Sequence, residues 1–295
     1  MSFEDRFLAV DWGTTNRRVF LIEGGQVARS ERDGKGVTAV EDFEREAGAI
    51  RDAFGDLPLL MAGMIGSNIG WRVAPYVSAP AGTAELAANL SWIDPRTAIV
   101  PGVSTTGPAD VMRGEEVQLL GAVEAGLVPA DSLLVQPGTH CKWVEMAGGR
   151  IAGFTSAMTG ELFALLRTHG LLAAQLGGDV TQGAAFLDGV EEGRKRDLAA
   201  SLFGIRAAKL LGERGDEDAA SFASGLLIGS DVAARLEAPG HDVIHVLADP
   251  VLGGLYAAAI EAHGRIASVI DSAAAFGAGI IAIGARAGNE PYRCL

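Results

Sequence analysis

Short apolar runs, most of them followed by glycine-rich turns, recur along the chain and predict buried strands. Leu8-Ala9-Val10 opens the series, and Arg18 to Ile22 forms a second strand after a tight turn. The further predicted strands are 57–63, 98–103, 133–135, 142–146, 243–247 and 266–270. Helical spacing of apolar residues predicts helices over 39–54, 110–126, most of 157–236, 255–263 and 272–287. Strands interleaved with helices predict an α/β fold.

A strand, a Gly-Thr turn and a second strand occur twice, first over residues 8–22 and again from Ser132 to Met146. Such a pseudo-repeat indicates two related halves. A chain of 295 residues is also long enough for two domains. We therefore predict an N-terminal domain over residues 1–128 and a C-terminal domain over 129–295, with a cleft between them and a last helix that can pack back on the first.

Composition narrows the class of ligand. The net charge of −13 argues against a nucleic-acid-binding surface, so a small molecule is expected. The first residues carry acids instead of an apolar signal segment, and the nearly uncharged stretch 273–285 is too short to cross a bilayer. We expect a cytoplasmic protein without a membrane partner, and the sequence leaves a homo-oligomer open. Cys141 and Cys294 suggest neither a disulfide framework nor a zinc site.

The turn that follows the first strand has the residues of a phosphate site. In Gly13-Thr14-Thr15-Asn16, small residues let backbone amides approach an anion, and the hydroxyls add donors. Arg18 follows closely, and Asp11 at the strand end is suited to hold a hydrated Mg²⁺. The alternative is an ordinary hairpin loop.

A second turn, Gly138-Thr139, repeats this chemistry. The two turns together are predicted to hold a polyphosphate, with His140 and Lys142 neutralising charge. Solvated residues on a strand edge are the alternative for His140 and Lys142. Glycines after a strand also let a nucleoside lie against the backbone. Asp249, Pro250, Gly253 and Gly254 are therefore a candidate segment for binding a base or ribose.

Asp110 is predicted near the start of helix 110–126, where a carboxylate also satisfies free backbone amides. Phosphoryl transfer to an alcohol needs a carboxylate that accepts the hydroxyl proton. Asp110 is the predicted base, and Asp11 serves the metal and phosphates. Arg113, one turn further on, is either an ion-pair partner or the residue that recognises a substrate carboxylate.

The order of these segments resembles the phosphate, connection, catalytic, second phosphate and adenosine segments of the actin, hexokinase and Hsp70 superfamily. Within it, the chain is similar to the 2-dehydro-3-deoxygalactonokinase family. The matching strings are D-W-G-T-T-N from Asp11, G-M-I-G-S from Gly63, V-M-R-G-E-E from Val111, P-G-T-H from Pro137, M-T-G-E-L-F from Met158 and S-G-L-L-I-G from Ser224.

The resemblance implies two actin-like (ribonuclease H-like) domains around an ATP cleft. It also implies ATP-dependent phosphorylation of the 6-hydroxyl of 2-dehydro-3-deoxy-D-galactonate in galactonate breakdown, with Mg²⁺. The substrate-binding candidates are Ser67, Trp71, Arg72, Tyr76, Arg113 and Glu115, and either Arg72 or Arg113 would offset the carboxylate of the sugar acid. Asn68, Ile69, Arg72 and Val73 depart from the family pattern, so the sugar acid is less closely defined than the kinase activity.

Three alternatives stay open at this point. One is a kinase of another sugar or sugar acid, including 2-keto-3-deoxygluconate, on the same fold. Another is a non-metabolic actin-like ATPase that changes shape with its nucleotide. A third is hydrolysis of polyphosphate or a phosphate ester.

Overall fold

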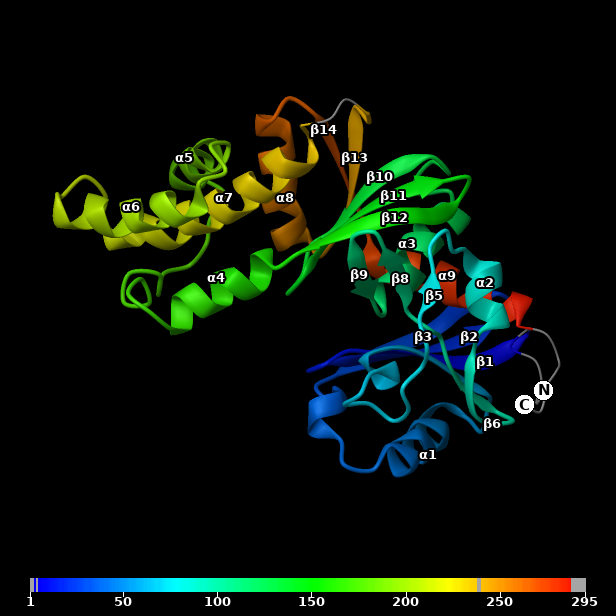
Figure 1. The fold of residues 1–295 in the computed structure, drawn as a ribbon. Coiled ribbons are helices and arrows are strands. Elements are labelled where there is room, and N and C mark those ends of the chain that lie inside the picture. Colours follow the sequence, from blue (N-terminus) through cyan, green and yellow to red (C-terminus); the bar gives the residue numbers. More distant parts are fainter. Residues whose placement is uncertain (1–2, 4, 238–239, 288–295) are drawn as a thin grey trace. The chain divides into compact units, whose positions relative to one another are not determined.

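The computed structural model describes residues 3, 5–237 and 240–287 (Figure 1). The chain divides into two compact units. Unit 1 consists of residues 1–131, 145–154 and 272–295, and unit 2 consists of 132–144 and 155–271. Residues 145–154 and 272–295, which the sequence analysis placed in the C-terminal half, thus group with unit 1. Cys294 lies outside the described residues, and Cys141 is a buried free thiol.

Unit 1 is built on a six-stranded sheet in the order β3-β2-β1-β4-β7-β6. Its strands are β1 (Arg6–Trp12), β2 (Arg17–Glu23), β3 (Gln26–Asp33), β4 (Leu59–Gly63), β6 (Ser91–Asp94) and β7 (Thr97–Ile99). β1 is antiparallel to β2 and parallel to β4, so the first turn and the end of β4 lie at the same sheet edge. A smaller sheet contains β5 (Val77–Ser78), β8 (Val103–Thr106) and β9 (Ala109–Met112).

The helical elements of unit 1 are η1 (Val37–Ala39), α1 (Phe43–Phe54), η2 (Met64–Gly66), α2 (Thr83–Ala88), α3 (Glu115–Glu124) and α9 (Ser272–Arg286). The core under β1 and β4 contains Leu8, Val10, Trp12 and Met61. α3 and α9 pack backbone to backbone, because a Cβ at Gly121 would lie 1.9 Å from the Ala275 carbonyl oxygen.

Unit 2 contains most of a five-stranded sheet in the order β12-β11-β10-β13-β14. The strands are β10 (Ser132–Gln136), β11 (Cys141–Ala147), β12 (Arg150–Ala157), β13 (Val243–Leu247) and β14 (Ile266–Ile270). In both large sheets the third, second, first and fourth strands follow one another in that order, which confirms the predicted repeat.

The helices of unit 2 are α4 (Thr159–Thr168), α5 (Ala184–Gly193), α6 (Leu198–Leu210), α7 (Asp216–Arg235) and α8 (Pro250–Ala262). α5 and α7 approach closely because glycines line both: a Cβ at Gly225 would lie 2.0 Å from the Phe186 carbonyl oxygen. Two apolar clusters form the core of unit 2, one around β10, β11 and β13 and one among α6, α7 and the 172–176 segment. Among the described residues, no helix is both long and apolar enough to cross a membrane.

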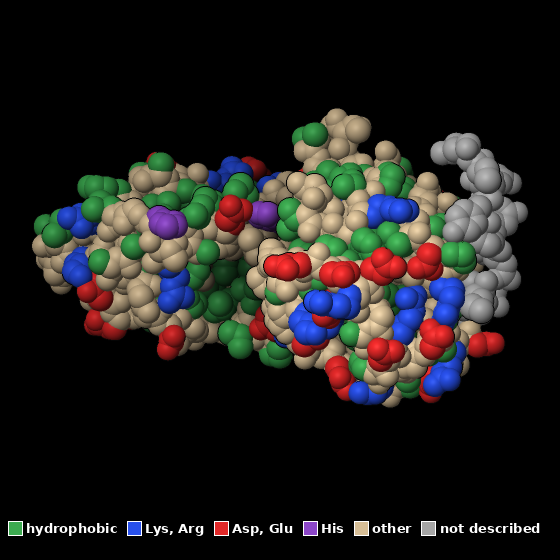
Figure 2. Space-filling model, turned by 90° about the horizontal axis from the view of Figure 1, so that it is seen from below, with side chains coloured by type: hydrophobic (Ala, Val, Ile, Leu, Met, Phe, Trp, Pro, Cys, Tyr) green, Lys and Arg blue, Asp and Glu red, His purple; other side chains and the backbone are tan. Residues whose placement is uncertain are grey.

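The surface carries charges of both signs. On the face shown in Figure 2, Lys and Arg side chains are interspersed with Asp and Glu side chains. Several charged side chains of the molecule are paired, such as Arg6 with Glu23 and Arg96 with Asp56. Such exposed pairs contribute roughly 0–1 kcal/mol each, so they do not decide the fold.

Candidate functional site

Asp11 lies at the carboxyl end of β1, where ligands gather in α/β sheets. Its backbone pairs with Arg18 on β2, and its carboxylate accepts a hydrogen bond from Gln118 Nε2 at 3.4 Å. The pKa of Asp11 is raised to about 6, mainly by burial; the charge of Arg18 opposes this rise, and the nearby charge of Glu115 contributes to it. Asp11 and Glu115 therefore form one electrostatic cluster at this sheet edge.

The first Gly-Thr turn is held from behind by a segment that the sequence analysis did not assign to the site. The Gly13 amide donates to the Asn16 carbonyl at 2.9 Å, and the Val37 amide donates to the Gly13 carbonyl at 3.0 Å. A Cβ at Gly36 would lie 2.3 Å from the Thr14 carbonyl oxygen. The side chains of Thr14, Thr15 and Asn16 stay exposed, so the turn is rigid and open to a ligand.

Asp110 does not lie at a helix start, and that part of the prediction is wrong. It belongs to β9, opposite Thr105 of β8, and its Oδ1 accepts a hydrogen bond from the Val111 amide at 2.7 Å. The helix begins five residues later, at Glu115. β9, the second strand of the short β8–β9 hairpin, occupies the region that was predicted as the first helical turn.

Glu115 and Glu116 form the start of α3. Glu115 accepts a hydrogen bond from the Arg113 amide at 2.9 Å, and buried Glu116 accepts the Gly114 amide at 2.7 Å. Gly114 has a φ of 104°, which strongly favours glycine, and a Cβ there would lie 3.0 Å from Gly63 Cα. This close approach joins the start of α3 to the end of β4, beside β1.

Burial raises the pKa of Glu116 to about 8, and the neighbouring charge of Glu115 acts in the same direction. The raised pKa favours the protonated form of Glu116 at neutral pH, and its carboxyl accepts the Gly114 amide at the start of α3. Glu115 remains half-buried.

Arg113 is placed to bind an anion. Its guanidinium lies over the Tyr76 ring, 4.4 Å from the centroid, and its Nη2 donates to the Ala74 carbonyl at 2.8 Å. Nε and Nη1 are buried without a hydrogen-bond partner within the described part of the chain. A buried donor without a partner costs about 1–3 kcal/mol, and more when it is charged. Each of the two free nitrogens can donate a charge-assisted hydrogen bond to an anionic oxygen, such as that of a carboxylate.

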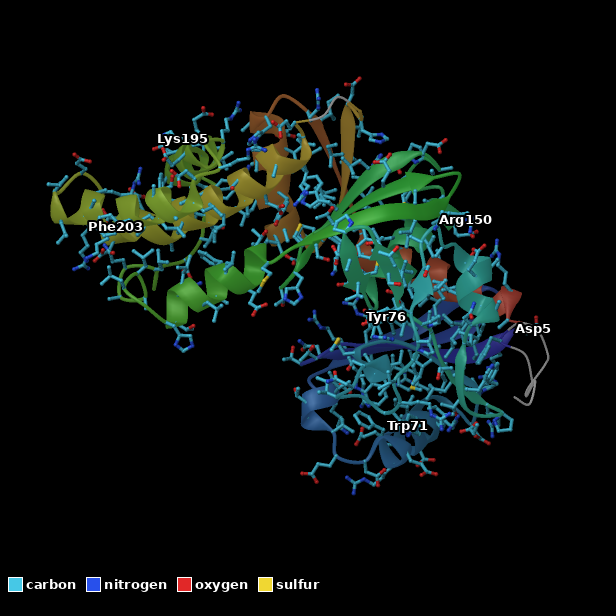
Figure 3. All side chains as sticks on the ribbon, in the orientation of Figure 1. Asp5, Trp71, Tyr76, Arg150, Lys195 and Phe203 are labelled. Atoms are coloured by element: carbon cyan, nitrogen blue, oxygen red, sulfur yellow. The ribbon has the colours of Figure 1, made fainter. Side chains whose placement is uncertain are left out.

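The other predicted substrate residues lie in the same unit (Figure 3). Trp71 stacks on Phe43, with ring centroids 6.5 Å apart, and Ser67 closes the turn after β4 by donating to the Met64 carbonyl at 2.7 Å. The exposed Arg72 donates from Nη1 to the Trp92 carbonyl. Of the two candidate arginines, Arg113 is therefore the one with buried unpaired donors.

The second Gly-Thr turn, between β10 and β11, packs on the start of α4. A Cβ at Gly160 would lie 2.2 Å from the Gly138 carbonyl oxygen, and the Glu161 amide donates to the Thr139 carbonyl at 2.9 Å. His140 pairs with Glu161 at 2.6 Å. Lys142 is only 5% exposed and donates to Ser156 Oγ, so the alternative of a solvated lysine on a strand edge is wrong.

A buried carboxylate holds the start of α4 in place. Asp231 on α7 accepts hydrogen bonds from Thr159 Oγ1 and Trp143 Nε1, both at 3.1 Å. Burial raises the pKa of Asp231, and these hydrogen bonds partly offset the shift. The sequence analysis assigned no role to Asp231 or Thr159, although the string from Met158 contains the latter.

A small cavity of about 80 Å³ opens beside this turn. Its lining is largely apolar and comes from the second turn, α4, α7 and α8: Gly138, Thr159, Gly160, Phe163, Ser224, Leu227, Ile228, Leu252 and Tyr256. None of the four predicted adenosine residues lines the cavity, but Leu252 lies between them in the chain.

The predicted adenosine segment forms the first turns of α8. Asp249 caps α8 by accepting the Val251 amide at 3.0 Å, and Pro250 is the first helical residue. Gly253 and Gly254 therefore lie inside the helix, and the predicted helix start at residue 255 was too late. A Cβ at Gly253 would lie 3.1 Å from Val269 Cγ1, so glycine here lets α8 pack closely on β14.

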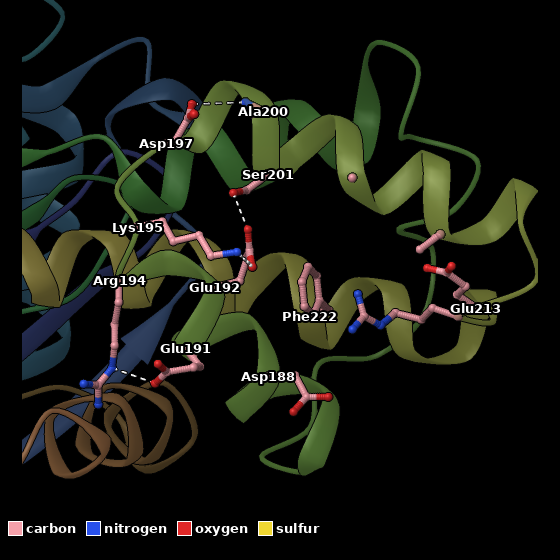
Figure 4. Close-up of a pocket in the computed structure, with 13 residues that line it drawn as sticks. Asp188, Glu191, Glu192, Arg194, Lys195, Asp197, Ala200, Ser201, Glu213 and Phe222 are labelled. Carbon is pink, nitrogen blue, oxygen red and sulfur yellow. Dashed lines mark hydrogen bonds and ion pairs between the residues drawn. The ribbon is translucent and has the colours of Figure 1, made fainter.

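A separate groove of about 970 Å³ lies among α5, α6 and α7 (Figure 4). Its charged walls include Glu192, which pairs with Lys195 at 2.7 Å and accepts Ser201 Oγ at 2.8 Å. None of the predicted site residues lines this groove.

The donor set at Asp11 suits a hard cation. Carboxylate oxygens are the ligands that Mg²⁺ prefers, and a cation would offset the burial that raises the pKa of Asp11. No group of three or more His, Cys, Asp or Glu side chains that could form a metal cage occurs among the described residues. A metal at Asp11 would therefore have few protein ligands and would keep several of its waters.

Comparison with known proteins identifies the family. The family model described as 2-keto-3-deoxy-galactonokinase matches residues 11–283. The chain belongs to this family. It is 38% identical over 287 residues to the 2-dehydro-3-deoxygalactonokinase of Escherichia coli (strain K12), covering 94% of this chain and 97% of that protein. It is also 36% identical over 294 residues to a probable 2-dehydro-3-deoxygalactonokinase of Rhizobium meliloti (strain 1021), covering 94% and 95%.

Solved structures agree with this family. A crystal structure from Sinorhizobium meliloti, assigned to 2-dehydro-3-deoxygalactonokinase, superposes with a TM-score of 0.88 at 34% identity and covers 94% of this chain and 97% of that one. Component A of the (R)-2-hydroxyglutaryl-CoA dehydratase of Acidaminococcus fermentans gives a TM-score of 0.51 at 12% identity, covering 95% and 97%, a likeness of fold alone. The predicted α/β fold with two actin-like domains and the predicted sugar-acid kinase family are both confirmed.

Proposed function

We propose that this member of the 2-keto-3-deoxy-galactonokinase family transfers the γ-phosphoryl group of ATP to the 6-hydroxyl of 2-dehydro-3-deoxy-D-galactonate. The observation that carries the proposal is the match of residues 11–283 to the family, together with two relatives of the same description over nearly their whole lengths. The product would be 2-dehydro-3-deoxy-6-phosphogalactonate, an intermediate of galactonate breakdown.

Both Gly-Thr turns are assigned to the phosphates of ATP. The first offers the exposed hydroxyls of Thr14 and Thr15, with Arg18 close to Asp11. The second offers Thr139 and His140 beside the start of α4, with Lys142 on β11. Asp11 would hold Mg²⁺ through water, and the bound metal would neutralise charge on the phosphates. The 80 Å³ cavity beside Gly138 extends the adenosine assignment from Asp249, Pro250, Gly253 and Gly254 to Leu252 and Tyr256.

Arg113 is assigned to the carboxylate of the sugar acid. The support is its pair of buried, unpartnered guanidinium nitrogens, held rigid by Tyr76 and the Ala74 carbonyl. Ser67, Trp71 and Tyr76 are assigned to the rest of the substrate. The exposed Arg72 is assigned to the solvent-facing side of the substrate site.

Two carboxylates are candidates for the base that accepts the proton of the attacking hydroxyl. Asp110 was predicted for this role at a helix start, but Glu115 occupies that position and shares the electrostatic cluster of Asp11. We therefore place Glu115 ahead of Asp110. Proton acceptance by a positioned carboxylate contributes about 10²–10⁴-fold to such reactions.

A coupled assay of ADP release tests the proposal. Purified protein with ATP and Mg²⁺ is offered 2-dehydro-3-deoxy-D-galactonate, 2-keto-3-deoxygluconate, simple aldonates and hexoses. We expect the galactonate derivative to give a kcat/KM at least about ten times that of any other acceptor. A higher kcat/KM with 2-keto-3-deoxygluconate would contradict the substrate, and ADP release that no acceptor stimulates would contradict the kinase activity.

A further inference from the structure

β14 is an unusually uncharged edge strand. It forms one edge of its sheet, next to β13 (Figure 1), and its residues Ile266 to Ile270 carry no charge. Ile266 is 63% exposed and Val269 is 47% exposed. Long uncharged edges invite pairing with another strand, and proteins commonly protect them with charges. β3, an edge of the other large sheet, has such protection from Arg29, Glu31 and Arg32.

The outer backbone groups of β14 can be assigned from its pairing with β13. The Ile266 amide donates to the Asp242 carbonyl at 2.9 Å, so residue 266 directs its backbone groups toward β13. Successive residues of a strand direct their amide and carbonyl groups to opposite sides. Ala267 and Val269 therefore present theirs to the outer edge, and Ser268 directs its own inward.

The residues around this edge would match those of an identical strand that runs in the opposite direction. Reading outward from Ser268, Ala267 mirrors Val269, Ile266 mirrors Ile270, and Arg265 mirrors Asp271. We propose that β14 pairs antiparallel with β14 of a second copy of this chain about a two-fold axis at Ser268, which joins the two five-stranded sheets.

This register satisfies both the hydrogen bonds and the charges. Ala267 faces Val269 of the second copy. Both residues direct their amide and carbonyl groups to the outer edge, so the two can exchange backbone hydrogen bonds. Arg265 and Asp271 flank the strand, so each end of the strand pair brings an arginine of one copy near an aspartate of the other, and opposite charges across strands are stabilising. Ile266 meets Ile270, which removes exposed apolar surface from water.

A second copy fits this edge better than an unrelated strand. The matched ends, Arg265 and Asp271, are self-complementary only when the two strands are identical and antiparallel. A two-fold axis is also the commonest symmetry of soluble oligomers. Because one short strand from each copy makes the central contact, we expect an association that depends on protein concentration in the micromolar range.

Disulfide trapping tests the register directly. Residues 268 of the two copies would form a pair without mutual hydrogen bonds, with Cα atoms about 4.5 Å apart, a separation at which a disulfide forms. In a Cys294→Ser background, Ser268→Cys should give a covalent dimer after mild oxidation. Ile266→Cys is the matched control, since its two copies would lie about 13 Å apart along the strands.

Analytical ultracentrifugation at protein concentrations from 1 to 100 µM tests the proposed pairing of Arg265 with Asp271. We expect the unmodified chain to form a dimer, Arg265→Asp to weaken association about tenfold or more, and Arg265→Asp with Asp271→Arg to restore it to within about threefold. Arg45→Asp, an exposed residue of α1, makes the same change of net charge and should have no effect. Ile266→Asp gives a test that does not depend on Asp271, and circular dichroism verifies that each variant is folded.

Three outcomes overturn the proposal. One is a chain that stays monomeric at 100 µM. Another is an oligomer that neither Arg265→Asp nor Ile266→Asp weakens. The third is cross-linking of Ile266→Cys that equals that of Ser268→Cys, which would indicate random collision or a different register.

Discussion

The proposed base is a single carboxylate at the start of α3. Glu115 lies in the electrostatic cluster of Asp11, and Asp110 lies on β9 five residues before the helix. We expect Glu115→Gln to lower kcat by about 10²–10⁴-fold with little change in the KM for ATP, because the base is lost and the phosphate turns are not. Asp110→Asn is the matched control and should retain at least about a tenth of the activity. Steady-state kinetics of both variants decide the assignment, and the reverse ranking would return the base to Asp110.

The guanidinium groups of Arg113 and Arg72 differ in their burial and in their hydrogen-bond partners. Two nitrogens of Arg113 are buried without partners, and the exposed Arg72 already donates to a backbone carbonyl. Arg113→Met should raise the KM for the sugar acid about 10- to 100-fold, because a charge-assisted hydrogen bond contributes about 1.5–3 kcal/mol. The KM for ATP should not change. Arg72→Met should alter both constants less than about threefold, and a larger effect there would exchange the two roles.

Glu116 makes stability depend on pH. Its pKa rises from 4.5 to about 8 on folding, so the folded state binds the proton more tightly than the unfolded chain. The free energy of unfolding should therefore fall as the pH rises from about 4.5 to about 8, by a few kcal/mol from this group. Glu116→Gln keeps an acceptor for the Gly114 amide without a charge. Urea titrations at pH 5 and pH 8 should show a smaller pH dependence for this variant, and an unchanged dependence would contradict the role of Glu116.

At the scale of elements, the second Gly-Thr turn packs directly on α4 at Gly160. A side chain at residue 160 would meet the Gly138 carbonyl, so Gly160→Val must move the turn or the helix. We expect the KM for ATP to rise about tenfold or more, with a smaller change in the KM for the sugar acid. Gly153→Val on β12 is the control, because a Cβ there meets nothing within 4 Å. Equal effects of the two substitutions on ATP would show that the contact does not position the turn.

The elements that the sequence predicted well are those whose apolar pattern is unbroken. β13 and β14 have the predicted bounds, because continuous apolar runs end in clear turns. β3 was missed because all eight of its residues are exposed and most are polar. Its sequence therefore lacks the alternation of apolar and polar residues that indicates a strand. The later part of β9 was read as helix because Asp110 resembles a helix cap, and Gly114, with its positive φ, was not recognised as the residue that precedes the helix.

The two Gly-Thr turns could be recognised because Gly and Thr mark them in the local sequence, but the contacts that support them could not. Gly36 and Asp231 act through contacts with residues far away in the chain, Thr14 and Thr159 respectively. Nothing in their immediate sequence indicates these partners. Arg113 was recognised as an anion-binding candidate, although the absence of an ion-pair partner could be learned only from the structure.

For the molecule as a whole, the chain passes from unit 1 to unit 2, returns to unit 1 over residues 145–154, completes unit 2 and ends the described part in unit 1 with α9. The return depends on glycines, since a Cβ at Gly279 would lie 1.9 Å from the Val117 carbonyl oxygen of α3. Unit 1 therefore requires residues from both ends of the described chain. Damage to α9 should consequently unfold unit 1 more than unit 2.

Two glycine-to-alanine substitutions test this dependence on α9. Gly279→Ala should lower the free energy of unfolding by about 1–3 kcal/mol or more, because the new methyl group separates α9 from α3. Gly204→Ala on α6 makes the same change where a Cβ meets nothing, and alanine there should raise stability by roughly 0.5–1 kcal/mol. Hydrogen exchange should show that Gly279→Ala loses protection in β1 and α3 before β10 and β13. Uniform loss across both units would mean that they unfold as one cooperative body, with α9 only one of many contacts that maintain it.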